Sequence, residues 1–177
     1  IVTKDNVERY RSSFAVNNFL ASAYTEGPIG NKLSYVLSAR VSPLTYEYRA
    51  VRKFLPQMLG GLDNFNAKVG DLYGKLHFQV NEKSALDASF LGSMDSYGYD
   101  TQGDSRDEMS WDNLLGIVRY RYDGEVTSFN LTASANRYGS RQKQDKTYRG
   151  EVSHFSLRSS LMEYGLKAGL QHRFLDD

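Results

Sequence analysis

The sequence contains no cysteine. A disulfide framework, a thiolate zinc site and a cysteine nucleophile are therefore excluded. No apolar run approaches the roughly 18 residues that a membrane-spanning helix needs. A dominant charge is also missing, because 22 basic and 21 acidic side chains leave a formal net charge of +1. This balance argues against bulk binding of nucleic acid.

What the chain does have is a long alternation of apolar and polar residues, clearest from Val126 to Arg137. An alternation of period two is typical of a half-buried β-strand. The strands of a soluble sandwich alternate too, but they run about five or six residues. One face here carries Phe129, Leu131, Ala133 and Ala135, and the other carries Ser128, Asn130, Thr132, Ser134 and Asn136.

Aromatic residues are abundant, with 13 tyrosines and 9 phenylalanines, whereas proline occurs only 3 times. Tyrosine favours strands and also gathers in the aromatic girdles at membrane interfaces. Mean hydropathy is negative, at −0.55, but the strands of a membrane barrel are only half apolar and score weakly. Alternation, strand length and aromatic content together favour a bilayer-spanning barrel.

The period-two pattern predicts about seven strands. The first has an ambiguous phase, because two interleaved sets of apolar residues compete for one face. The last changes phase near Met162, which indicates a β-bulge or, as the less favoured alternative, a tight turn. The predicted strands are Tyr10–Thr25, Leu33–Ser42, Asp71–Val80, Ala85–Asp95, Trp111–Tyr122, Val126–Arg137 and Glu151–Arg173.

Short turns alternate with long connections along the chain. An up-and-down order then puts all the long connections at one end, as in transmembrane barrels with short periplasmic turns and long extracellular loops. Gly, Pro and polar residues mark the short turns at Glu26–Lys32, Asn81–Ser84 and Asp123–Gly124. The long connections are Pro43–Lys68, where a short helix is expected before Pro56, the acidic Ser96–Glu108 and the basic Gly139–Gly150.

We therefore expect an all-β fold: an antiparallel up-and-down meander of about seven long strands that is part of a large transmembrane β-barrel. Two alternatives stay open. One is a small self-contained outer-membrane barrel of about eight strands, acting as an adhesin or an enzyme. The other is a soluble β-barrel that binds a ligand, in which the apolar stripe is buried as core.

Several short segments stand in a characteristic order over nearly the whole chain. They are Glu26–Ile29, Lys32–Tyr35 with its strand closing on Arg40, Asp71–Leu76, Phe90–Tyr97, Trp111–Gly116 and Met162–Lys167. In this order and spacing they resemble early barrel strands of TonB-dependent outer-membrane receptors of the kind common in Bacteroidota.

The resemblance implies that residues 1–177 are a partial receptor barrel, without the plug domain, the TonB box or the remaining strands of a barrel of about 22. Ile1 is neither a start methionine nor part of a signal peptide, which suggests a fragment of a longer chain. The implied function is uptake of a scarce or bulky extracellular ligand across the cell outer membrane of a Gram-negative bacterium. Neither a cofactor nor enzyme activity is expected. The implied partners are outer-membrane lipid, the plug and remaining strands, the TonB complex and, in some receptors of the family, a surface lipoprotein.

The same interpretation gives each strand face an environment. Apolar faces would contact lipid, tyrosines near strand ends would join an interfacial belt, and the opposite polar faces would line the barrel lumen. The lipid-facing and belt residues include Leu72, Leu76, Phe78, Phe129, Leu131, Ala133, Tyr120, Tyr122 and Tyr164. The expected lumen-facing residues are Arg40, Lys75, Asn113, Arg119, Arg121, Asn130, Asn136 and Lys167.

Five tyrosines in the predicted long connections are candidate ligand contacts, because their amphipathic rings could stack on a sugar, a haem or a siderophore. The simpler alternative is that the acidic and basic connections pack against each other. The candidates are Tyr46, Tyr48, Tyr97, Tyr99 and Tyr148.

Motifs for metal binding and catalysis are weak. An acidic group could bind calcium, which prefers oxygen ligands, although a solvated acidic loop is the simpler interpretation. The three histidines lie on separate predicted strands without metal-ligand spacing. No Gly-x-Ser-x-Gly elbow, phosphate-binding loop or dinucleotide glycine pattern is present. The acidic candidates are Asp100, Asp104, Asp107 and Glu108, and the histidines are His77, His154 and His172.

Overall fold

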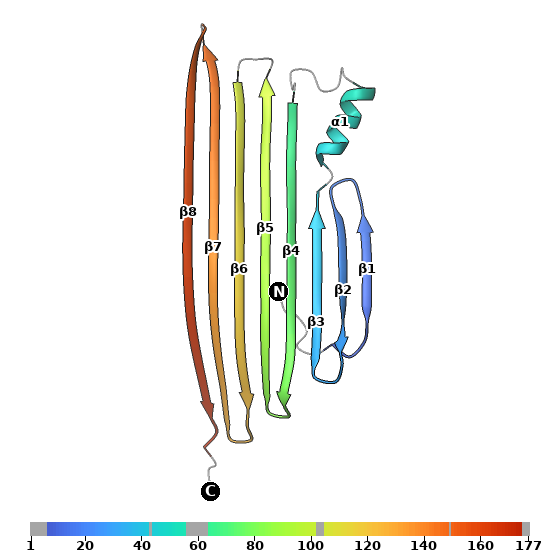
Figure 1. The fold of residues 1–177 in the computed structure, drawn as a ribbon, viewed down its shortest axis with the longest axis vertical. Helices are drawn as coiled ribbons and strands as arrows, with labels where there is room; N and C mark the ends of the chain where they lie inside the picture. The colour runs from blue at the N-terminus through green and yellow to red at the C-terminus, as the bar shows by residue number, and fades with distance from the viewer. Residues whose placement is uncertain (1–6, 43, 56–63, 102–104, 149, 175–177) are drawn as a thin grey trace.

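The computed structural model describes residues 7–42, 44–55, 64–101, 105–148 and 150–174. There the chain forms one antiparallel sheet, whose eight strands follow one another in sequence order, and one short helix (Figure 1). The predicted all-β, up-and-down meander is confirmed. The elements are β1 (Arg11–Val16), β2 (Ala21–Ile29), β3 (Leu33–Val41), α1 (Leu44–Phe54), β4 (Asn64–Asn81), β5 (Ser84–Thr101), β6 (Ser105–Asp123), β7 (Thr127–Tyr148) and β8 (Glu151–His172).

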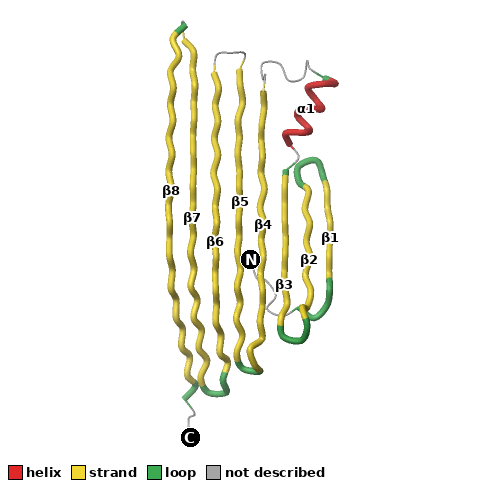
Figure 2. The backbone as a smooth tube through the Cα atoms, in the orientation of Figure 1, coloured by secondary structure: helices red, strands yellow, loops and turns green. Residues whose placement is uncertain are grey.

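The short strands β1 to β3 stand beside the long strands β4 to β8 (Figure 2). Strands β1 to β3 have 6 to 9 residues, whereas β4 to β8 have 18 to 22. At about 3.4 Å per residue, a strand of that greater length measures roughly 60–75 Å. That length exceeds the roughly 40–45 Å thickness of a whole bilayer. The long strands therefore extend well beyond the ends of the short ones.

The predicted first strand is wrong, because it is two strands joined by a tight turn. The Asn17 side-chain oxygen accepts hydrogen bonds from the amides of Phe19 and Leu20, each at 2.9 Å. The Asn17 amide in turn donates to the Leu20 carbonyl at 2.9 Å. The turn reverses the chain, which explains why two apolar phases competed in the sequence. The next turn is also shorter than predicted, since β2 continues to Ile29.

Two of the predicted long connections are wrong as well. Most of residues 96–108 and 139–150 belong to β5, β6, β7 and β8. The acidic stretch of β6 pairs with the basic stretch of β7, so that Glu108 lies opposite Lys143 and Arg106 lies opposite Asp145. Opposite charges on paired positions favour such a ladder. The predicted helix in residues 43–68 is confirmed as α1, which is not long enough to cross a membrane, and no other helix occurs in the described chain.

The predicted bulge near Met162 is wrong. The register between β7 and β8 runs without a shift from Thr127 opposite His172 to Tyr148 opposite Glu151. Residues of one parity therefore stay on one side along the whole of β8. We call the side that carries Phe78, Leu86 and Leu131 face A, and the side that carries His77, Asp87, Arg119 and Thr132 face B.

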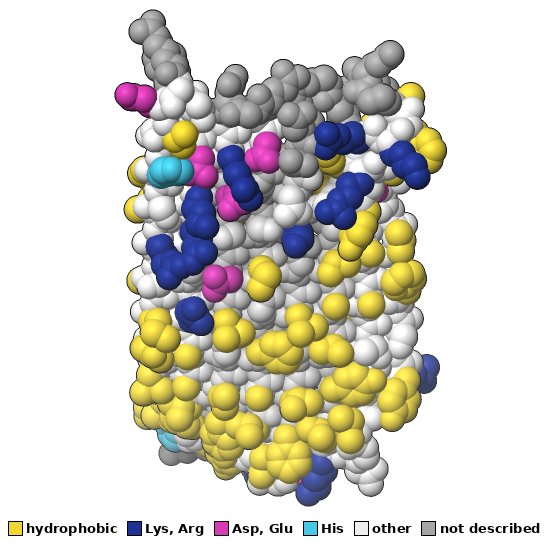
Figure 3. Space-filling model, turned by 45° about the horizontal axis from the view of Figure 1, so that its top comes forward, with side chains coloured by type: hydrophobic (Ala, Val, Ile, Leu, Met, Phe, Trp, Pro, Cys, Tyr) yellow, Lys and Arg dark blue, Asp and Glu magenta, His cyan; other side chains and the backbone are white. Residues whose placement is uncertain are grey.

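Face A has an uncharged band across its lower half. Three successive rows from β3 to β8 contain only apolar, aromatic, alanine or glycine residues. These rows are Leu33/Phe78/Leu86/Tyr120/Leu131/Ala168, Tyr35/Leu76/Ala88/Val118/Ala133/Leu166 and Leu37/Gly74/Phe90/Gly116/Ala135/Tyr164. The row on either side is mostly apolar, with Arg137 in the upper one and Asn81 and Ser84 in the lower one, and with these two rows the band measures roughly 27 Å along the strands. Above it, face A is charged (Figure 3).

Face B has the opposite distribution of polarity. Behind the uncharged band it carries ionic and amide side chains together with Leu91, Leu115 and Ile117. Behind the charged part of face A most of its large apolar side chains gather, namely Phe65, Tyr97, Met109, Trp111 and Leu157. The two faces exchange character at the height of Met162. The phase change that the sequence shows there is thus a change of environment within a regular strand.

Burial is unusual for a folded chain of this size. Among the described residues, the buried apolar side chains are only Val7, Val36, Ala67 and Ala85. Charged and polar ones are buried as well, including Glu26, Lys75, His77 and Asp87. Large apolar side chains of face A, such as Leu166 at 77 % exposure, are open instead. The described sheet therefore has no conventional apolar core.

Helix α1 takes over the position beside β4 where β3 ends. The Thr45 hydroxyl donates to the Ala67 carbonyl at 2.6 Å and accepts from the Ala67 amide at 3.0 Å. Both backbone groups of Ala67 would otherwise face an empty edge, and an unpaired strand edge is prone to pair with other chains. The helix thus covers the upper edge of β4, and its contact with that edge includes the buried side chain of Thr45.

Replacing Thr45 by valine should free the Ala67 amide without changing the size of the side chain. One hydrogen bond contributes about 0.5–1.5 kcal/mol, so hydrogen exchange at Ala67 should rise about 2- to 12-fold. Exchange measured by mass spectrometry on peptides of β4 would show this. Thr45→Ser keeps the hydroxyl and serves as the control; equal exchange in both variants would contradict the role of Thr45.

Candidate functional site

An aromatic strip runs from α1 across face B in the upper part of the sheet. The ring of Tyr48 lies 5.2 Å from that of Phe65, which lies 5.6 Å from Tyr97, which in turn lies 5.8 Å from Tyr99. These tilted and edge-on arrangements are the ones that aromatic pairs prefer. We call Tyr48, Phe65, Tyr97 and Tyr99 the aromatic strip. It joins three of the five tyrosines that the sequence singled out.

Of the other two tyrosines, Tyr46 does not join the strip. Tyr46 lies on α1 and is 73 % exposed, and none of the ring contacts among the described residues involves it. Tyr148 is the last residue of β7, at the upper end of the sheet. Phe65 was missed because it lies in the stretch between Pro43 and Lys68 that the sequence appeared to leave irregular. Its alternation with Ala67 and Val69 was the available signal.

Polar groups flank the strip on the same face. Tyr99 donates a hydrogen bond to the Asp107 carboxylate, which raises the pKa of the tyrosine. The Gln144 amide donates to the same carboxylate at 2.6 Å. A row of rings bordered by a carboxylate and an amide offers both stacking and hydrogen bonding to a ligand, which is the usual chemistry of a binding surface.

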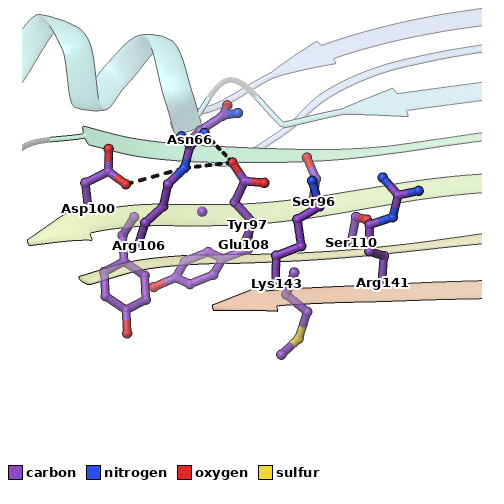
Figure 4. Close-up of a pocket in the computed structure, with 12 residues that line it drawn as sticks. Asn66, Ser96, Tyr97, Asp100, Arg106, Glu108, Ser110, Arg141 and Lys143 are labelled. Atoms are coloured by element: carbon purple, nitrogen blue, oxygen red, sulfur yellow. Dashed lines mark hydrogen bonds and ion pairs between the residues drawn. The ribbon is translucent and has the colours of Figure 1, made fainter. Parts of the chain in front are cut away.

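A charged cavity of about 310 Å³ opens on face A at the same height (Figure 4). Arg106 lies between two carboxylates, with its Nε 3.0 Å from Glu108 Oε1 and 3.8 Å from Asp100 Oδ1. The hydrogen bond to Glu108 and its charge raise the pKa of the guanidinium further. Arg141 and Lys143 also line the cavity. The cavity thus contains the side chain of Arg106, which is held by the carboxylates of Glu108 and Asp100.

The candidate calcium ligands do not converge. Asp100 and Glu108 are held by Arg106 on face A, whereas Asp107 lies on face B. Asp104 lies outside the described residues. No group of three His, Cys, Asp or Glu side chains in the described chain is arranged to hold a metal ion. The acidic residues therefore form ion pairs within a strand ladder and do not form the loop expected from the sequence.

A second cluster lies on face B behind the uncharged band. The Asp87 carboxylate is 2.9 Å from His77 Nδ1 and 3.3 Å from Lys75 Nζ. All three residues are buried. The other histidines lie far from it in the fold, since His154 pairs with Asp145 near the top of the sheet and His172 bonds Thr127 at the bottom. The prediction that the three histidines lie on separate strands is wrong, because His154 and His172 stand near opposite ends of β8, whereas His77 lies on β4.

All eight side chains expected in the lumen lie on face B, by strand register. Their partners differ. Arg40 forms a two-oxygen hydrogen bond with Asp71, both at 2.9 Å, and Lys75 joins the Asp87 cluster. The buried side-chain oxygens of Asn113 and Asn136 accept no hydrogen bond in the described protein. That face B lines a barrel lumen stays a prediction. That the eight residues share one face follows from the strand register alone.

Comparisons with known proteins add no identity. No family model, no curated protein and no solved structure matches this chain. The resemblance to TonB-dependent receptors therefore depends on the sequence segments alone.

Removing the charge of Asp107 should lower the pKa of Tyr99. Because the neighbouring carboxylate raises the pKa of this phenol, Asp107→Asn should let Tyr99 ionise at a lower pH than in the unsubstituted protein. Tyrosinate absorbance, compared with that of Tyr99→Phe, would isolate this transition. Glu108→Gln removes the same charge from face A and should leave it unchanged; an unaltered Tyr99 titration in Asp107→Asn would contradict the contact.

Proposed function

We propose that this chain is part of the β-barrel of an outer-membrane receptor that imports a scarce or bulky extracellular ligand by TonB-coupled energy. The observation that carries the membrane part is the uncharged band of face A. Tilted by about 40°, a band of roughly 27 Å along the strands gives a height near 20 Å, close to the roughly 25 Å apolar belt of transmembrane barrels. The resemblance of the strand segments carries the receptor part.

The exposure of the apolar side chains on face A supports the proposal that this face contacts lipid. Soluble monomers rarely expose apolar patches larger than a few hundred Å², and this band extends over six strands. Leu166, Leu170 and Tyr164 on β8 are each more than 70 % exposed. The soluble carrier would have to bury this band under a second layer, and the described residues supply none.

The polar side supports a wet or protein-filled interior behind the band. Lys75, His77 and Asp87 satisfy one another, yet the side-chain oxygens of Asn113 and Asn136 do not find a partner among the described groups. Buried polar atoms without a partner are uncommon and usually meet water or another molecule. A plug domain or lumen water would supply the missing donors.

The aromatic strip is the proposed ligand surface. It lies above the band on face B, so in a barrel it would line the extracellular mouth. The rings with Asp107 and Gln144 suit a ligand that has flat apolar faces and hydrogen-bonding edges, such as a sugar, a haem or a siderophore. The role is binding and import, without a chemical step or a cofactor.

A second candidate is a small self-contained barrel that acts as an adhesin or an enzyme. The number of strands favours it, since eight strands are enough to close a small barrel. The difference in length between the first and last strands argues against this candidate. In the described residues β1 pairs only with β2 and β8 only with β7, and strands of 6 and 22 residues could pair along only a fraction of the longer one.

The intact protein from its source cells should distinguish these candidates. We expect it in the outer-membrane fraction, as a chain several times longer than 177 residues with a plug-like region before Ile1. Intact mass and N-terminal sequencing would measure this. A mature protein of about the 20.1 kDa of this chain would favour the small barrel, and a protein soluble without detergent would favour the carrier.

Adjacent residues of β7 test which face meets lipid. Leu131→Arg would put a charge in the uncharged band and cost about 2–4 kcal/mol at the bilayer midplane, so assembly in outer-membrane vesicles should fall sharply. Thr132→Arg puts the same side chain on face B and should be tolerated. The folded fraction is measured by heat-modifiable mobility in gels; equal yields of the two variants would reject the assignment of the faces.

A further inference from the structure

Five cations gather on face A directly above the uncharged band. We call Lys68, Arg137, Arg141, Lys143 and Arg158 the basic belt. Lys68, Arg141 and Arg158 lie in one row across the sheet, with the hydroxyls of Ser96 and Ser110 between them. The row stands two rows above the last apolar one, which contains Leu72 and Leu114. Figure 3 shows Lys and Arg side chains above the apolar part of the face in view.

The basic belt has an excess of positive charge, although Glu108 lies opposite Lys143 and Asp112 lies opposite Gly139, between Arg137 and Arg141. All five side chains are exposed, and none forms an ion pair with another described residue. The nearby carboxylates are already engaged, because Arg106 binds Asp100 and Glu108 while His154 binds Asp145. Only Asp112 lies close in the register without such a partner. The surface around Arg141 is therefore left positive.

One pair within the belt is unfavourable on its own. Arg141 lies directly opposite Arg158 in the β7–β8 register, and like charges on directly paired positions destabilise a sheet. An anion between the two guanidinium groups would reverse that effect. The neighbouring cavity is lined by Ser96, Ser110, Arg141 and Lys143 (Figure 4). Guanidinium groups bind phosphate through two parallel hydrogen bonds, and the hydroxyls supply further donors.

We propose that the basic belt binds the phosphate groups of lipid headgroups in the outer leaflet. This inference rests on the proposed function, because it takes face A as the lipid side. Headgroup phosphates lie just outside the hydrocarbon layer, at the height where the belt follows the uncharged band, and clustered Lys and Arg beside a membrane attract anionic lipids. Arg137 lies in the last apolar row itself, where a long side chain extends its charge toward the headgroups. In an outer membrane these phosphates belong to lipid A.

The test uses the intact protein, purified from the outer membrane and delipidated, with lipid A in detergent as the probe. Native mass spectrometry should show bound lipid A, and removal of its phosphates should weaken binding about tenfold or more. This arm needs no variant. Equal binding of dephosphorylated lipid A would overturn the proposal, and displacement by a molar excess of inorganic phosphate would assign the belt to a soluble anion.

A matched pair of variants locates the site. Arg141→Gln/Arg158→Gln should weaken lipid A binding by about tenfold or more, whereas Arg49→Gln/Lys53→Gln removes two exposed cations from α1 and should leave it unchanged. Unchanged binding in the first variant would overturn the proposal. An intact protein that resides in the membrane yet ignores lipid A would reject this inference alone; one that never enters the membrane would reject the proposed function too.

Discussion

The unbroken register between the long strands is the constraint on which the other features depend. From β5 to β8 no residue is inserted or skipped, so the parity of a residue fixes its face over as many as 22 positions. A slip of one residue would turn every side chain of a strand to the other face. It would put the carboxylate of Asp87 or the guanidinium of Arg119 among the apolar rows. Register and polarity therefore determine each other in this sheet.

The sequence predicted the strands best where one face is apolar and the other polar. The stretches 71–80, 85–95 and 111–122 lie within β4, β5 and β6, and 126–137 lies within β7 except for its first residue. Prediction failed where both parities are polar, as in Ser105–Glu108 and Ser140–Lys146, because backbone hydrogen bonds hold a ladder without any apolar pattern. At Asn17 the opposite occurred: apolar Phe19 and Leu20 disguised a turn that depends on one side-chain oxygen.

The candidate site shows the same division. Alternation alone put the eight polar residues of face B on one side, and the register agrees. The contacts that give the site its chemistry depend on neighbours from distant strands and were not predictable. Lys75, His77 and Asp87 meet only because β4 folds back on β5 through a short turn, and Phe65 joins Tyr48 to Tyr97 only because α1 ends the row of strands. Burying such charges costs free energy unless they pair. Because they pair only in the observed register of β4 and β5, the cluster favours that register.

The upper rim of the sheet is stepped. Strand β3 stops at Val41, opposite Gly70, while β4 continues six residues further to Asn64, a difference of about 20 Å. On that flank the wall is completed by a helix and not by a strand. A displaced strand must break a whole ladder of backbone bonds, but α1 is joined to β4 by the Thr45 bridge and the Tyr48–Phe65 contact. The flank is therefore held by side-chain contacts of α1, whereas the rest of the sheet is held by backbone ladders, and the aromatic strip begins directly behind it.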